Sequence, residues 1–174
     1  LSHFEKVLLL DADNIVGRDP SILFEHSVFK ELGAVFWPDY GPFVAKNGRG
    51  TWRALSEGTW SDGPAHIQRE QESGQLLVDK SKCAGALQRL VEAAIHLDEL
   101  AAHLPGDGGD KDLFQISWAL SGMPFHMCPE RPGALGVLTE QGFSGHTMVH
   151  HGLDGVPMFF HRTIDKHDDP LILE

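Results

Sequence analysis

The stretch Lys6-Val-Leu-Leu-Leu-Asp-Ala-Asp-Asn14 decides how this chain folds. Its run of apolar residues predicts a buried strand, and two carboxylates one residue apart, Asp11 and Asp13, follow that strand. In an open α/β sheet, ligands bind beyond the carboxyl ends of the strands. Side chains at i and i+2 of an extended segment point the same way, so both carboxylates can face one divalent cation or a cation-bound diphosphate.

Length and charge narrow the class of protein. With 174 residues and 41% hydrophobic content, residues 1–174 are expected to form a single α/β domain. The formal net charge of −11 repels nucleic acid and anionic lipid, so neither is expected as a partner. No stretch has the apolar length of a membrane span, so we expect no membrane contact by this chain. Cys83 and Cys128 match no zinc spacing and are compatible with one disulfide or with two buried thiols.

The start of the chain suggests a piece of a longer protein. The first residue is Leu1 rather than Met, and the leading strand begins a few residues later without a preceding helix or nucleotide-binding turn. We therefore expect activity to belong to the longer protein.

The remaining pattern predicts helices and strands around one long loop, 40–70, which is rich in Gly, Pro, Ser and Trp. Asp19 is the expected N-cap of the first helix, and Asp110 that of the last. We expect helices over 20–24, 27–33, 81–104 and 113–120, strands over 34–37, 75–79 and 124–127, and a hairpin of 147–151 with 156–161 around an Asp-Gly turn.

Polar clusters lie at the ends of several predicted elements, and their convergence would make one site. Each cluster also has an ordinary explanation: Asp110 could only cap a helix, Glu72 could be an exposed loop charge, and His161 is one of 11 histidines. The clusters are Asp11 with Asp13, Glu72-Ser-Gly-Gln75, Asp110-Lys-Asp112, and His161 at the end of the last strand.

Six sequence blocks, in order along nearly the whole chain, are similar to one enzyme family. The blocks are Leu9-Leu-Asp-Ala-Asp-Asn14, Arg18-Asp-Pro20, Gly33-Ala-Val-Phe-Trp-Pro-Asp39, Gln71-Glu-Ser-Gly-Gln-Leu-Leu-Val-Asp-Lys80, Gly109-Asp-Lys-Asp112 and Asp154-Gly-Val-Pro-Met-Phe-Phe-His-Arg162. Together they resemble the α-mannosyltransferase family typified by fungal Golgi α-1,3-mannosyltransferases.

This resemblance implies a retaining transferase with a GT-A-like (Rossmann-like) mixed sheet flanked by helices, here lacking its N-terminal nucleotide-binding strands. It implies transfer of mannose from GDP-mannose to a hydroxyl of an acceptor glycan or glycoprotein, with Mn²⁺ or another divalent cation as cofactor. It also implies an α-1,3 linkage and a place in the Golgi lumen, as part of a type II membrane protein. Retention could use a carboxylate nucleophile or same-face attack, and the sequence leaves both open.

A more distant likeness to glycogenin-type transferases implies roles for single residues. The metal ligands would be Asp11, Asp13 and His161. Besides Asp11 and Asp13, the donor-binding residues would be Ser73, Gly74, Gln75, Asp110 and Lys111, and Glu72 or Asp110 would supply the negative potential that the anomeric carbon needs. Trp52 and Trp60 lie in the long loop, where a tryptophan can form a sugar platform or anchor the loop to the core. The acceptor contacts are expected at Asp39, Trp52 and Trp60.

Three alternatives stay open. The chain could belong to a GT-A transferase that uses another nucleotide sugar, such as a UDP-sugar. It could be a glycan-binding relic without activity. A zinc hydrolase on His146, His150 and His151 is the third, although histidines at i and i+4 suit a helix and this segment has a strand pattern.

Overall fold

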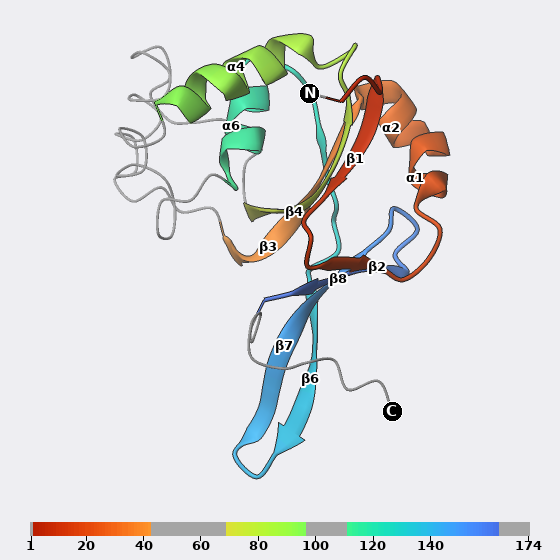
Figure 1. Ribbon diagram of the computed structural model, residues 1–174, viewed down its shortest axis with the longest axis vertical. Helices are drawn as coiled ribbons and strands as arrows, with labels where there is room; N and C mark the ends of the chain where they lie inside the picture. Colours follow the sequence, from red (N-terminus) through yellow and green to blue (C-terminus); the bar gives the residue numbers. More distant parts are fainter. Residues whose placement is uncertain (1, 43–68, 97–110, 164–174) are drawn as a thin grey trace.

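The computed structural model describes residues 2–42, 69–96 and 111–163, which form a mixed α/β structure with two sheets (Figure 1). The strand order is β1-β4-β3-β5 in the large sheet and β2-β8-β7-β6 in the small one. The strands are β1 Lys6–Leu10, β2 Asn14–Val16, β3 Ala34–Pro42, β4 Arg69–Asp79, β5 His126–Met127, β6 Gly133–Thr139, β7 Gly142–His151 and β8 Pro157–Arg162. The helices are α1 Ser21–Glu25, α2 Ser27–Leu32, α4 Ala84–Ile95 and α6 Leu113–Leu120. None of these described helices is long and apolar enough to cross a membrane.

Strand β1 lies at an edge of the large sheet. It pairs with β4 in antiparallel register, from Lys6 opposite Asp79 to Leu10 opposite Gln75. Leu9 is 49% exposed, so the prediction of a buried strand is wrong. A short apolar run does not reveal whether its strand has neighbours on both sides, because pairing is decided by distant segments.

The two faces of the large sheet carry separate cores, because side chains alternate along β3. Val35 and Trp37 face α1 and α2, where they pack with Leu23 and other buried residues. Phe36 faces α4 and α6 and packs edge-on against Trp118, with the ring centroids 5.1 Å apart. The two helix pairs therefore cover opposite faces of the sheet (Figure 1).

The small sheet is attached to the end of the large one through Trp37. Its ring packs edge-on against Phe159 of β8 at 5.2 Å, and its indole N–H donates to the carbonyl of His151 at 2.8 Å. Arg18 pairs with Asp154 in the turn between β7 and β8. The predicted Asp-Gly hairpin, which joins β7 to β8, is confirmed. Strands β6 and β7 form a second hairpin that extends away from the large sheet and its helices (Figure 1).

Several element boundaries differ from the sequence-based expectation. Strand β4 begins at Arg69 instead of residue 75, and β3 continues through Pro38, where its pairing with β4 becomes irregular. Strands β2 and β6 were not predicted. The first helix begins at Ser21 with Pro20 at the N-cap position, although Asp19 does accept the Ser21 N–H. The polar residues at the start of β4 explain why its beginning was predicted too late, because polar residues that find buried partners hide a strand from pattern-based prediction.

The cysteines settle one open alternative. Both are free, buried thiols, and they lie in the two different cores, on opposite faces of the large sheet. Burial raises the pKa of the Cys128 thiol to about 12, and it also raises that of Cys83. The chain therefore holds Cys83 and Cys128 as two packed thiols and not as one disulfide.

Helix α6 is fixed to β4 by the side chain of Asp112. The residue at the N-cap position is Asp112, not Asp110, which lies outside the described residues. The Oδ1 atom of Asp112 accepts the Gln71 backbone N–H at 2.8 Å and the Gln115 side-chain N–H at 2.6 Å. Burial raises the pKa of this carboxyl to about 6, although both hydrogen bonds and Lys111 oppose the rise.

We expect Asp112→Asn to change how stability depends on pH. Because the folded carboxyl has a pKa of about 6 and the unfolded one about 3.9, the folded state binds more protons between these values. This group therefore makes the wild-type protein less stable as pH rises from 4 to 6. The amide cannot ionise, so the stability of the variant relative to wild type should rise over that interval, by at most about 3 kcal/mol. Urea unfolding at pH 4, 5, 6 and 7 measures it, and parallel profiles for the two proteins would contradict the assignment.

Candidate active site

A tight turn carries Asp11 and Asp13 from one sheet to the other. The Asp11 N–H donates to the carbonyl of Gly74 at 3.0 Å, and the Asn14 N–H donates to the carbonyl of Asp11 at 3.0 Å. Asn14 then begins β2, where it lies opposite His161 of β8. The turn is therefore held by β4 on one side and by the last strand on the other.

The three predicted metal ligands come together at this turn. The Nε2 atom of His161 lies 3.1 Å from Asp13 Oδ1 and 4.0 Å from Asp11 Oδ2, and the three donor atoms lie within 4.8 Å of one another. The side chains of Asp11 and Asp13 are 49% and 30% exposed, whereas that of His161 is 7% exposed. The cluster is therefore open to solvent on its carboxylate side and closed on its imidazole side.

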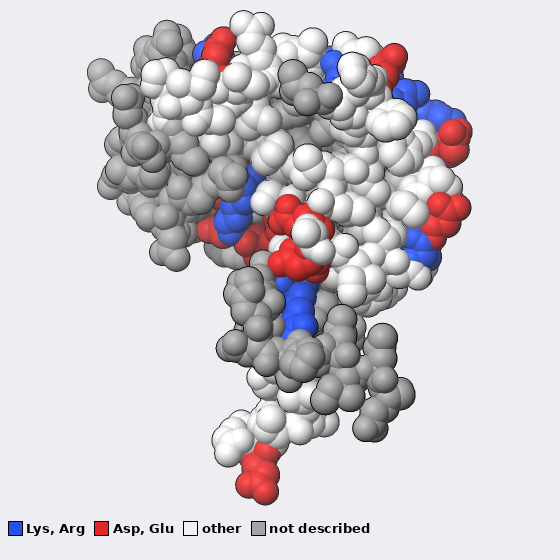
Figure 2. Space-filling view, viewed as in Figure 1, with Lys and Arg blue, Asp and Glu red and all other residues white. Residues whose placement is uncertain are grey.

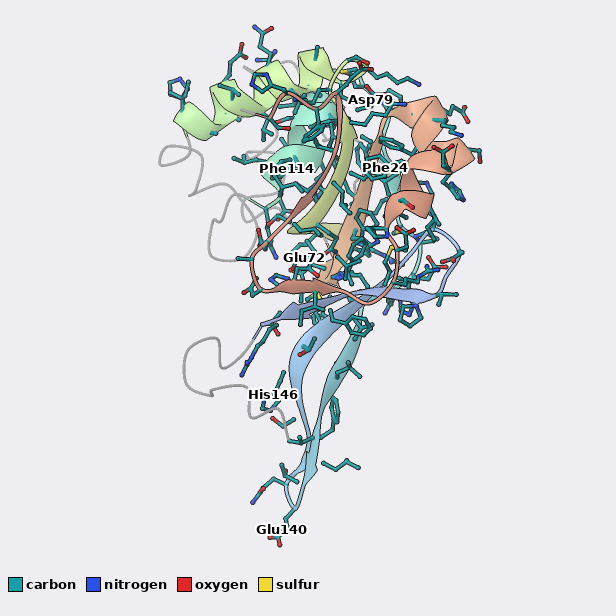
Figure 3. The ribbon with its side chains drawn as sticks, turned by 45° about the vertical axis from the view of Figure 1, so that its right-hand side comes forward. Phe24, Glu72, Asp79, Phe114, Glu140 and His146 are labelled. Carbon is teal, nitrogen blue, oxygen red and sulfur yellow. The ribbon has the colours of Figure 1, made fainter. Side chains whose placement is uncertain are left out.

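Glu72 lies behind the imidazole. Its Oε1 accepts the Gly74 N–H at 2.8 Å and lies 3.4 Å from His161 Nδ1. Burial alone would raise the pKa of Glu72, but His161, the Gly74 N–H and the nearby His150 together lower it. Figure 3 shows Glu72 between the end of the large sheet and strands β2 and β8. Glu72 is thus a buried carboxylate facing His161, not an exposed loop charge.

Gly74 provides the space for this arrangement. A Cβ atom at Gly74 would lie 2.6 Å from His161 Nδ1 and 3.1 Å from Glu72 Oε1. No side chain fits there unless the imidazole moves. The glycine is therefore required by close packing against His161, and the partly buried Ser73 precedes it on β4.

Asn14 is a site residue that the sequence reasoning missed. Its Nδ2 donates to the carbonyl of Gly74 at 2.7 Å and to Oε1 of Gln75 at 2.6 Å. Gln75 is fully buried, so it supports the turn from below. The signal was available, because an amide placed directly after the two carboxylates begins an otherwise apolar strand.

Lys111, predicted to contact the donor, is held by two carboxylates. Its Nζ pairs with Asp39 Oδ2 and lies 3.0 Å from Glu70 Oε2. Burial opposes the charge of this amine, yet the two carboxylates raise its pKa above the ordinary value. Asp39, a predicted acceptor contact, is thus engaged by Lys111. The other predicted contacts, Asp110, Trp52 and Trp60, lie outside the described residues.

The histidines of β7 do not form the alternative zinc site. His146 and His150 lie four residues apart on a strand, which separates them by about 13 Å. His150 is buried, and its Nε2 lies 3.0 Å from the carbonyl oxygen of Pro38, within hydrogen-bond distance. Figure 3 shows His146 on the hairpin, away from Glu72. Within the described residues, the group able to hold a metal ion is the cluster at Asp11, Asp13 and His161.

Acidic side chains gather on the surface where the large sheet and its helices meet the hairpin of β6 and β7 (Figure 2). In a chain of net charge −11, such a surface attracts cations and repels an uncompensated diphosphate. The carboxylates of Asp11 and Asp13 could hold a cation here.

Comparison with known proteins points to one family. Residues 1–47 and 61–152 match the family described as "Mannosyltransferase putative". The chain is 28% identical to alpha-1,2-mannosyltransferase MNN2 of Saccharomyces cerevisiae over an alignment 183 residues long. That alignment covers 86% of the chain and 31% of that protein. It is 60% identical over 40 residues to alpha-1,2-mannosyltransferase MNN21 of Candida albicans, covering 23% of the chain and 6% of that protein.

A Candida albicans protein named "Putative alpha-1,3-mannosyltransferase MNN13" is 24% identical over 149 residues, or 70% of the chain and 18% of that protein. The chain thus spans less than a third of each of these relatives. Relatives of both linkages match, with the alpha-1,2 enzymes ahead, so the α-1,3 specificity implied by the sequence blocks is not supported.

We expect Gly74→Ala to displace His161 and to disturb the cluster. The new methyl group would overlap the imidazole, so the free energy of unfolding should fall by about 1–3 kcal/mol. Gly85→Ala in α4 is the control, because its Cβ would meet only Met123 Sδ, at 3.6 Å, and alanine favours a helix. Chemical denaturation measures both variants, and equal stability of the two would contradict the close contact at Gly74.

Proposed function

The chain belongs to the mannosyltransferase family, and from this premise we propose that it forms the metal- and donor-binding region of an α-mannosyltransferase that uses GDP-mannose. The observation that carries the proposal is the meeting of Asp13 and His161, 148 residues apart, beside Asp11. The acceptor would be a hydroxyl of a glycan or glycoprotein. A GT-A-like fold, with which the mixed α/β layers are compatible, is part of the proposal.

The donor atoms suit a divalent cation such as Mn²⁺. Two carboxylates and one imidazole are ligands that Mn²⁺ accepts, and the exposed carboxylate side leaves room for diphosphate oxygens. A bound ion would act as a Lewis acid that neutralises the leaving GDP. Asp11 and Asp13 would hold it from the solvent side and His161 from the protein interior.

The rest of the chain's task is to keep these groups in place. Asn14 and the carbonyl of Gly74 fix the turn, so the carboxylates do not have to be ordered when the donor binds. Groups ordered in advance lower the entropic part of the barrier.

Our proposals for the cellular setting and the linkage rest on the family alone. We propose a secretory-pathway enzyme acting in the Golgi lumen, because the sequence blocks resemble Golgi mannosyltransferases. Within this proposal α-1,2 transfer ranks before α-1,3, since the two alpha-1,2 relatives described above share more identity with the chain than the alpha-1,3 relative does.

We expect Asp13→Asn in the full-length protein to reduce Mn²⁺-dependent release of GDP from GDP-mannose by at least about 100-fold, because it removes one of the two ligand charges. Glu140→Gln is the matched control, because it also removes one negative charge, but in the turn between β6 and β7, far from the cluster (Figure 3). Turnover is measured with manganese and with chelator.

Each outcome of this assay separates the alternatives. Undiminished turnover by Asp13→Asn, or turnover that persists in chelator, would falsify the metal site. Turnover of UDP-glucose but not GDP-mannose would favour a transferase with another donor. Glycan binding without turnover of either nucleotide sugar would favour the inactive relic.

A further inference from the structure

We propose that Glu72 is a positioning residue for His161: its carboxylate holds the imidazole so that Nε2 faces the carboxylates of the 11–13 turn. This inference rests on the proposed function, since it gives Glu72 a task in the proposed metal site. It differs from the role expected from the sequence, in which Glu72 itself acts on the donor sugar.

The two ring nitrogens of His161 face opposite acidic groups. Nδ1 lies 3.4 Å from Glu72 Oε1, and Nε2 lies 3.1 Å from Asp13 Oδ1. In metal sites, a carboxylate on one imidazole nitrogen fixes the tautomer and the ring orientation and leaves the other nitrogen to bind the ion. The order Glu72, His161, proposed metal site follows this arrangement, with the carboxylate at ion-pair distance from Nδ1.

Glu72 is itself held firmly enough for this task. Its Oε1 accepts the Gly74 N–H at 2.8 Å, and its backbone lies on β4 opposite Trp37, one of the most buried residues of the large sheet. The glycine lets the imidazole approach this carboxylate, because any Cβ there would overlap Nδ1. A fixed acceptor can impose an orientation on a ring that touches it.

Burial also argues against direct contact between Glu72 and a sugar. The Glu72 side chain is 11% exposed and that of His161 is 7% exposed, whereas Asp13 is 30% exposed. The imidazole is therefore the ligand that the interior fixes, and the carboxylates are the ones that solvent and ligand can reach. A group behind the imidazole acts on the site through that ring.

The test compares Glu72→Gln with Glu70→Gln in the full-length protein. Both glutamates lie on β4 and are mostly buried, but Glu70 pairs with Lys111 instead of His161. Binding of Mn²⁺ alone is followed by the electron paramagnetic resonance signal of the free ion. We expect Glu72→Gln to weaken Mn²⁺ binding about 10- to 100-fold, and Glu70→Gln to change it less than about 2-fold.

A double-mutant cycle with His161→Gln separates positioning from simple loss of charge. Glutamine offers one ligand atom near the position of Nε2 but has no counterpart of Nδ1. If Glu72 acts through the ring, adding Glu72→Gln to this variant should have less than about 2-fold further effect on Mn²⁺ affinity. An equal loss in both backgrounds would mean that Glu72 acts through its charge alone, and would overturn the proposal.

A measurement without metal distinguishes failure of this inference from failure of the proposed function. If the wild-type protein binds no Mn²⁺, the proposed function falls, yet the contact itself can still be judged. Nitrogen-15 NMR of the metal-free protein should show a slowly exchanging Nδ1–H on His161 that Glu72→Gln removes. Absence of that proton from the wild-type spectrum would overturn the positioning role whatever the metal result.

Discussion

The packing of Trp37 against the last strand is the contact on which the rest of the site depends. The ring meets Phe159 edge-on, and its N–H bonds to the carbonyl of His151, so one side chain joins β3 to both strands of the hairpin. Burying an indole gives strong attachment, and the hydrogen bond gives it direction. His161 follows Phe159 by two residues, and its position over β4 is a consequence of this docking.

The site is assembled from pieces that have no local reason to meet. The turn at 11–13 leaves the large sheet, β4 contributes Glu72 and Gly74, and β8 contributes His161. Because these pieces belong to different sheets, the geometry of the cluster and the stability of the fold are coupled. A change in the contact between the sheets would move the imidazole relative to the carboxylates, without any change in the three side chains themselves.

The same structure divides polar groups into two kinds. Asp112 uses its carboxylate internally, to fasten α6 to β4, and burial raises its pKa to about 6. Glu72 is also buried, but an imidazole and a backbone N–H stabilise its charge and lower its pKa. The opposite directions of the two pKa shifts therefore follow from the partners of each carboxylate, because both residues are buried. Both residues looked alike in the sequence, as acids near the end of an element.

The sequence by itself determined the leading strand, the acidic turn, the Asp-Gly hairpin and the identity of the three clustered side chains, because local pattern and ordered blocks carry that information. Only the tertiary structure decided that β1 is an edge strand, that β4 begins six residues earlier than predicted, and that Lys111 is held by Asp39 and Glu70. It also decided that Glu72 faces His161 and that Asn14 pins the turn. These facts depend on which distant segments become neighbours, and the spacing of residues along the chain does not specify that.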